Sequence, residues 1–242
     1  MRHLITLVVA LILGVATLSA QSAKDLPRTI YSQEWKAGHI QGIAVDTKKG
    51  YIYYSFTTML IKADLQGNIV GTVKGLLGHL GCIEFNEEDG RIYGSLEYKN
   101  DSIGRGILKQ ENTSKHWDSA FYVAIFDVDK ITREGMSAEK DGIMTSVYLP
   151  TVLEDFEAKV VSNGKTLEHR YGCSGFDGIT FGPKFGRAMA SDILLSPMAS
   201  MATAPAQTTT IKFYFSMTPR TGRSTNTPSR RRVCTPLAPQ SP

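Results

Sequence analysis

One segment of the chain occurs twice, and this repeat restricts the possible folds more than any other feature. Residues 39–56 (HIQGIAVDTKKGYIYYSF) align without a gap to residues 79–96 (HLGCIEFNEEDGRIYGSL), forty positions later. A weaker third copy, GFDGITFGPKFG, spans residues 175–186. Self-similarity at such a period indicates a fold in which one structural unit is stacked several times.

Each copy has the pattern of a β-hairpin. A β-rich run leads into a polar turn that ends in Gly50 or Gly90, and a second β-rich run follows. Gly at that place supplies the positive φ that a tight hairpin turn requires. After the first copy, residues 59–63 and 69–73 predict two further strands, with a turn at 65–68. Four strands in about forty residues is the period of one blade of a β-propeller.

The alternation of side chains along these strands also predicts the core. Successive side chains in a strand point to opposite faces. In each copy, two apolar residues that are separated by one residue therefore share one face. We expect these positions to pack between neighbouring blades. They are Ile43, Val45, Ile83, Phe85, Ile179 and Phe181.

The first copy and its two following strands, GIAVD…GYIYYSF…MLIKADLQGNIV, resemble a blade of the NHL and SMP-30-type β-propellers. The similarity covers residues 38–96 and part of 175–187, and it implies an all-β fold of four-stranded antiparallel blades. Residues 38–187 hold two clear blades and the start of a third, which is an incomplete ring because a propeller needs at least four blades to close. Such propellers serve both as enzymes and as binding scaffolds, so the resemblance specifies no function.

The segment before the blades predicts export. Residues 1–20 have a short polar start, a run of fifteen mostly apolar residues and a small-residue end at Ala20, which is typical of a cleaved signal peptide. The run is shorter than the ~20 residues that span a membrane, although an uncleaved anchor is the alternative. We therefore expect a secreted or periplasmic protein without a stable membrane anchor after cleavage. Residues 21–37 are predicted to form an N-terminal linker.

The composition changes at about residue 188. Residues 188–242 hold seven of the ten prolines, one of the 22 glycines, one acidic residue and six basic residues. The overall charge of +4 therefore belongs to this tail, and it does not indicate a nucleic-acid partner. One interpretation is a disordered, irregular extension. The other is a product of the wrong reading frame, since glycines, acids and turns disappear where a hairpin should continue. Met is always encoded by ATG and Ala by GCN, so a frame that starts at the third base of a Met codon reads GGC at each Met-Ala pair of the tail. GGC encodes Gly.

Two histidines and one aspartate are candidate ligand-binding residues. His39 and His79 precede equivalent strands, so a propeller would place them on one face near its central channel, where imidazoles can bind a ligand or a metal. The alternative is that each histidine caps the start of its strand, as a structural part of the repeat. Asp177 occupies the position that is Gln41 and Gly81 in the earlier copies.

The resemblance to SMP-30-type enzymes makes Asp177 a candidate calcium ligand, because hard cations prefer carboxylate oxygens. The alternative is an aspartate that stabilises the turn before Gly178. Apart from this possible calcium ion, the sequence predicts no cofactor. The three cysteines form no CxxC pair, so a zinc site is not supported. Cys82 and Cys173 either form a disulfide in an oxidising compartment, or Cys82 is a packed thiol.

These features predict an exported binding module with an extracytoplasmic protein, glycan or small molecule as its ligand. Insertions at 98–119 and 129–145, which are predicted to be loops, would shape its site. One alternative is a calcium-dependent hydrolase or lactonase of the SMP-30 type. Another is a truncated fragment without a function. A nucleophile elbow, a Walker loop and a dinucleotide fingerprint are all missing from the sequence.

Overall fold

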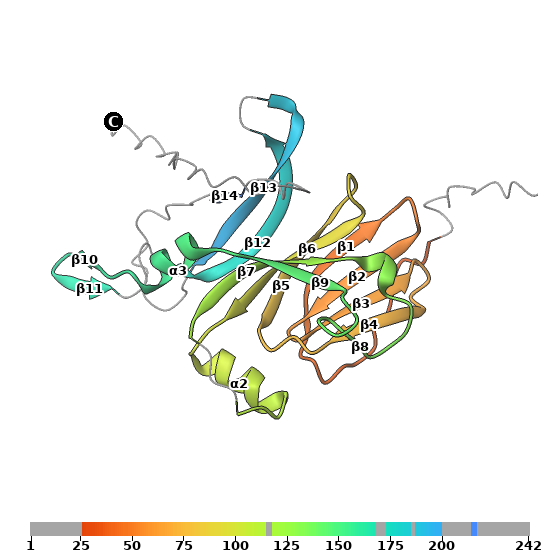
Figure 1. Ribbon diagram of the computed structural model, residues 1–242, viewed down its shortest axis with the longest axis horizontal. Helices are drawn as coiled ribbons and strands as arrows, with labels where there is room; N and C mark the ends of the chain where they lie inside the picture. The colour runs from red at the N-terminus through yellow and green to blue at the C-terminus, as the bar shows by residue number, and fades with distance from the viewer. Residues whose placement is uncertain (1–25, 115–117, 168–172, 185–186, 200–213, 217–242) are drawn as a thin grey trace, which may run out of the picture.

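The computed structural model describes residues 26–114, 118–167, 173–184, 187–199 and 214–216 (Figure 1). The predicted signal peptide at 1–20 lies outside these residues. The described part consists mainly of β-strands in antiparallel sheets that do not close on themselves, together with two α-helices. The prediction of a fold built mainly from antiparallel β-sheets is confirmed.

Sheet 1 contains the first copy of the repeat and has the strand order β1-β2-β3-β4-β8. Its strands are β1 (Ile40–Asp46), β2 (Tyr51–Phe56), β3 (Met59–Asp64), β4 (Ile69–Lys74) and β8 (Met136–Ser137). The first four strands are antiparallel neighbours, and the short β8 pairs with β4 in parallel. The turns between β1 and β2 and between β3 and β4 contain glycines with positive φ, as their sequences predict.

Sheet 2 contains the second copy and has the order β5-β6-β7-β9. Its antiparallel strands are β5 (His79–Asn86), β6 (Arg91–Tyr98), β7 (Ala120–Phe126) and β9 (Met144–Tyr148). All four strands lie where the repeat and the β-rich runs predict them, within a few residues at each end.

Sheet 3 contains the third copy and has the order β12-β13-β14. Its strands are β12 (Cys173–Lys184), β13 (Arg187–Ala199) and β14 (Tyr214–Ser216). Strand β13 covers the beginning of the predicted irregular tail, so residues 188–199 are not irregular. A separate hairpin of β10 (Val160–Ser162) and β11 (Lys165–Leu167) projects away from the sheets (Figure 1).

The insertion at 98–119 is not a plain loop, which corrects the prediction. It contains helix α2 (Ser102–Gln110), whose N-cap Asp101 accepts a hydrogen bond from the Gly104 amide at 2.8 Å. The glycines of this segment lower its helix propensity and hid the helix in the sequence. The second insertion, 129–145, includes part of a 3-10 turn (Val128–Lys130) and β8, and helix α3 (Pro150–Glu157) follows β9.

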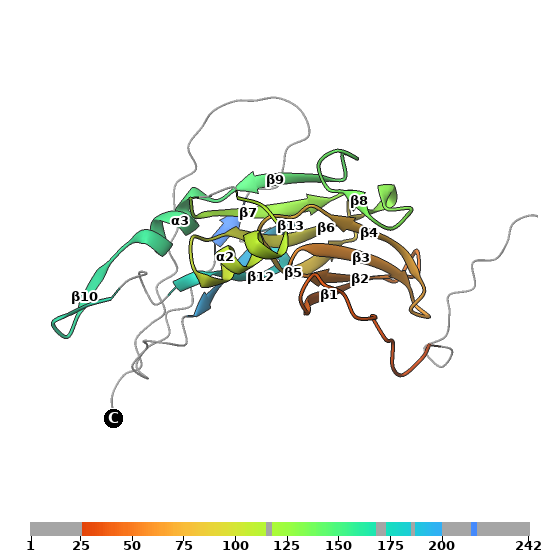
Figure 2. The same cartoon turned by 90° about the horizontal axis from the view of Figure 1, so that it is seen from below.

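The three sheets lie next to one another through their first strands. Strand β1 contacts β5, and β5 contacts β12 (Figure 2). One apolar cluster fills the space between sheets 1 and 2, and a second joins sheets 2 and 3 with α3. A third lies on the far face of sheet 1, where Ile30, Trp35 and Ala37 of the N-terminal segment cover part of it.

The contact between neighbouring sheets repeats with the sequence. The Phe85 ring stacks on Tyr53 of sheet 1, with ring centroids 6.1 Å apart. Phe181 meets Tyr93 of sheet 2 edge to face at 5.0 Å. Tyr53 and Tyr93 occupy the same position of the repeat, as do Phe85 and Phe181. Successive sheets are therefore held by aromatic contacts between equivalent positions of the repeat, stacked in the first pair and edge to face in the second.

The predicted core is correct for sheets 2 and 3 and wrong for sheet 1. Ile83 and Ile179 are buried, and their neighbours Phe85 and Phe181 pack against the clusters. Ile43 and Val45 are instead 54% and 40% exposed. They lie on the face of β1 that no other described sheet covers, so the repeat pattern alone did not determine their burial.

Candidate functional site

The beginnings of the three first strands lie at one end of the stacked sheets, which we call the strand-start face. There the Leu80 amide of β5 donates to the Thr57 carbonyl of sheet 1 at 2.8 Å. At the equivalent place between sheets 2 and 3, the Phe176 amide donates to Oε1 of Glu97 at 2.6 Å. The second link uses a carboxylate instead of a backbone carbonyl, which places a buried charge at this face.

Glu97 is the centre of a buried polar cluster. Its Oε2 forms an ion pair with Nζ of Lys99 at 3.0 Å, and both side chains are almost completely buried. Nδ1 of His79, the cross-strand neighbour of Glu97, lies 3.9 Å from the same oxygen. Removing two charges from water is unfavourable unless the pair is held in good geometry. The hydrogen bond to Phe176 is charge-assisted and fixes the carboxylate further.

Gly175 allows Glu97 to approach sheet 3. A Cβ at this position would collide with Oε1 of Glu97, and the φ of +136° also disfavours a side chain. The two earlier copies have His39 and His79 here. Glu97 in sheet 2 therefore requires a glycine at position 175 in sheet 3. The third copy has this glycine where the first two copies have a histidine.

A small cavity of about 30 Å³ lies beside this cluster, beneath α2. Its lining includes Gly78, Glu97, Lys99, Gly104 and Arg105. A space of this size holds water but not a drug-sized ligand. A larger ligand would have to bind at the outer surface of the strand-start face.

The structure places the two predicted histidines in different surroundings. The His79 side chain is mostly buried next to Glu97, whereas His39 is exposed and its Nε2 lies 3.1 Å from Nε2 of Gln41. Gln41 in turn donates to Oγ1 of Thr57 at 3.2 Å. Both histidines lie at the strand-start face, as the repeat predicts, but only His79 lies beside a buried carboxylate.

The other candidates from the sequence are Asp177, a metal site and Cys82. Asp177 lies in β12, and its side chain is outside the described part of the structure. Within the described residues, no group of three or more histidine, cysteine or acidic side chains could hold a metal ion. Cys82 is a free thiol whose Sγ lies 4.0 Å from the Ile179 carbonyl, so of the two alternatives the packed thiol is present.

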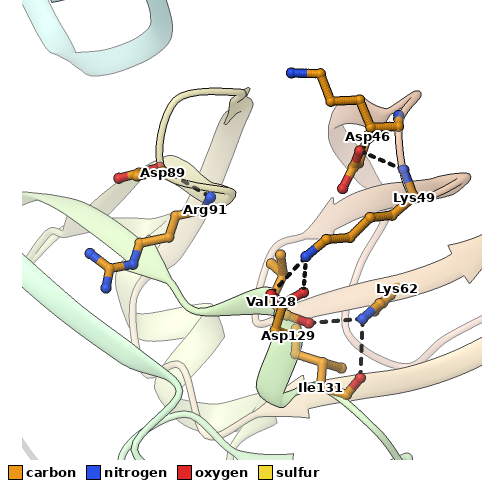
Figure 3. A network of polar contacts seen from close by, with 9 residues as sticks. Asp46, Lys49, Lys62, Asp89, Arg91, Val128, Asp129 and Ile131 are labelled. Carbon is orange, nitrogen blue, oxygen red and sulfur yellow. Dashed lines mark hydrogen bonds and ion pairs between the residues drawn. The ribbon is translucent and has the colours of Figure 1, made fainter.

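A second polar network lies at the opposite end of the sheets (Figure 3). Nζ of the buried Lys62 donates to the Val128 carbonyl at 2.9 Å and to the Ile131 carbonyl at 3.4 Å. Burial lowers the pKa of Lys62. Nζ of Lys49 pairs with the exposed carboxylate of Asp129. Because the Lys62 ammonium donates to two backbone carbonyls of the 128–131 turn, this network fastens that turn to sheet 1.

Sequence reasoning missed Glu97 and Lys99. Both follow the last β-rich run of the second copy, in the stretch LEYKN, where the sequence indicates the start of a loop. The available signal was the pair of departures from the repeat, Glu97 in place of Thr57 and Gly175 in place of His79. Neither departure shows by itself that the two residues meet.

The sequence matches no protein-family model and no curated protein. Among the helices of the described residues, none has the length and apolar character needed to cross a membrane.

Proposed function

We propose that this chain is an exported binding module of the β-propeller type, with its ligand on the strand-start face. Three sheets with a common repeat, joined through their first strands and by equivalent aromatic contacts, support the propeller arrangement. The resemblance to NHL and SMP-30-type propellers agrees with it. The ligand is an extracytoplasmic glycan, peptide or small molecule with polar groups.

The observation that carries this proposal is the buried Glu97–Lys99 pair next to His79. The carboxylate is fixed by contacts from sheets 2 and 3, so the site is organised before a ligand arrives. Preorganisation reduces the entropy that binding must overcome. His79 keeps a small exposed area beside the fixed carboxylate, and His39 is exposed on the same face. These imidazoles are the groups that would meet the ligand.

The test is a binding screen of the secreted chain against defined panels of neutral oligosaccharides, acidic oligosaccharides and short peptides. For any ligand found, His79→Ala is expected to weaken binding at least about tenfold, which corresponds to ~1.4 kcal/mol. Lys48→Ala is the control, because Lys48 is exposed and lies in the β1–β2 turn at the opposite end. A ligand whose affinity depends on Lys48 but not on His79, or a screen without any ligand, would contradict the proposal.

A calcium-dependent hydrolase or lactonase is the alternative proposal, based on Asp177 and the family resemblance. A specific site filled at a hundred times its Kd stabilises the folded state by about 2.7 kcal/mol. Calcium chloride should then raise the melting temperature of the wild-type chain but not that of Asp177→Asn. Magnesium chloride at equal ionic strength is the control, and equal shifts with both salts would exclude the alternative.

A truncated fragment produced by a frameshift is the third proposal. In this proposal residues 188–242 are translated in the wrong reading frame. The correct frame of the gene would encode further blades after residue 187. Resequencing the gene decides it. A stop codon in the alternative frame within a few codons of Arg187 would refute this proposal and favour a genuine tail.

A further inference from the structure

We infer that two copies of this chain associate head to tail, with sheet 1 of each copy against sheet 3 of the other. The inference rests on the propeller arrangement proposed above. It starts from Ile43 and Val45, two apolar side chains that are 54% and 40% exposed on the same face of β1. The equivalent residues of sheets 2 and 3 all pack against the neighbouring sheet.

Each sheet has two faces with different roles in the stack. The trailing face carries the positions of Ile83 and Phe85, and the leading face carries the position of Tyr53. The trailing face of sheet 2 packs on the leading face of sheet 1, as the contact between Phe85 and Tyr53 shows. The trailing face of sheet 3 packs on the leading face of sheet 2 in the same way, through Phe181 and Tyr93.

One face of each kind is left uncovered by these contacts. The trailing face of sheet 1 exposes Ile43 and Val45. On the leading face of sheet 3, Thr180 is exposed and occupies the position of Ala44, which is buried between sheets 1 and 2. By the geometry of the repeat, a leading face is the natural complement of a trailing face. The described part of the chain thus presents both halves of one further contact.

The open part of the sheet 1 face is narrow. Ile30, Trp35 and Ala37 already pack on the outer part of this face, so the strip along β1 is what remains for a partner. Within the described residues sheet 3 is also narrow, since β14 pairs there with three residues of β13, Ile193–Leu195. The partner face therefore needs to cover a strip rather than a whole four-stranded sheet.

Sheet 3 of the same chain cannot provide this cover, because it is packed on the other side of sheet 2. A second copy can. The contact is heterologous, and such contacts either close into a ring or propagate into a filament. The three stacked sheets of the described residues give six for two copies, which lies within the range of four to eight blades that close a propeller. Closure would bring the strand-start faces of both copies around one axis.

The first test is the mass of the full chain in solution by light scattering after size-exclusion chromatography. We expect twice the monomer mass for the wild type and the monomer mass for Ile43→Asp. Ile103→Asp is the matched control, since Ile103 is equally exposed but lies on α2, and it should remain a dimer. A monomeric wild type, a dimeric Ile43→Asp variant or growth into larger assemblies would each overturn the inference.

The second test establishes the head-to-tail direction. Ile43→Cys and Thr180→Cys are introduced separately into chains whose native cysteines are replaced by alanine, and a short bismaleimide is added. Cross-linked dimer is expected when the two variants are mixed but not with either variant alone. Cross-linking of Ile43→Cys with itself would show a symmetric contact and refute the proposal. A monomer that still binds a ligand through His79 would refute the dimer while leaving the proposed function intact.

Discussion

Glu97→Gln tests the buried cluster most directly. Glutamine has nearly the same size and keeps an acceptor for the Phe176 amide, so the substitution removes little besides the negative charge. It leaves the Lys99 ammonium, whose side chain is 4% exposed, without its carboxylate. Breaking a buried ion pair by removing one partner costs about 3–5 kcal/mol. Since the hydrogen bond to Phe176 is retained, we expect a loss near the lower limit, about 3 kcal/mol.

The assay is equilibrium unfolding of the full chain in urea, followed by circular dichroism. With a urea dependence of about 2–3 kcal/mol per molar, the midpoint should fall by roughly 1–1.5 M. Glu87→Gln is the matched control. Glu87 pairs with Lys48 at the same N–O distance of 3.0 Å, but these two side chains are 63% and 68% exposed. An exposed pair contributes at most about 1 kcal/mol, so this midpoint should move little.

The double variant Glu97→Gln/Lys99→Met separates charge from packing. Replacing both members of a buried pair with uncharged groups is often neutral or stabilising, so much of the lost stability should return. The coupling between the two sites then follows from the double-mutant cycle. If Glu97→Gln and Glu87→Gln have equal effects of less than about 0.5 kcal/mol, the reasoning about burial at the strand-start face is refuted.

Three further predictions concern the core, the pH dependence and export. Phe85→Ala should lower the free energy of unfolding by about 3 kcal/mol because its ring stacks on Tyr53, whereas Val161→Ala, at a 70% exposed position, should change it little; equal shifts in urea midpoint would contradict the assigned core. Burial, with a smaller contribution from Asp89, raises the pKa of Tyr93 to about 12, while an unfolded tyrosine titrates near about 10. The stability that comes from this pKa difference is therefore present below about pH 10 and is lost as the pH rises towards about 12. Over this pH range the urea midpoint should fall less for Tyr93→Phe than for the wild type. An equal fall of the two midpoints with pH would contradict this prediction. Mass spectrometry of the exported protein should show a start near Gln21, with about twenty residues removed, and an intact leader in that fraction would refute the signal peptide.

The sequence by itself determined most of the strands of sheets 1 and 2 and the hairpins that they form. The ungapped repeat, the alternation of apolar residues and the glycines at the turns are local signals, because hairpin geometry depends on neighbouring residues. Strands β1 to β7 and β9 lie close to where these signals place them. The positions of His39 and His79 at one end of the sheets follow for the same reason.

Only the tertiary structure decided which of these residues are buried and which charges meet. Ile43 and Ile83 share one position of the repeat, yet one is exposed and the other buried, because burial depends on whether a neighbouring sheet is present. Glu97 and Phe176 are 79 residues apart, and their contact exists because sheets 2 and 3 are stacked. A local pattern specifies the backbone of each strand, whereas the neighbours that cover its side chains come from distant parts of the chain.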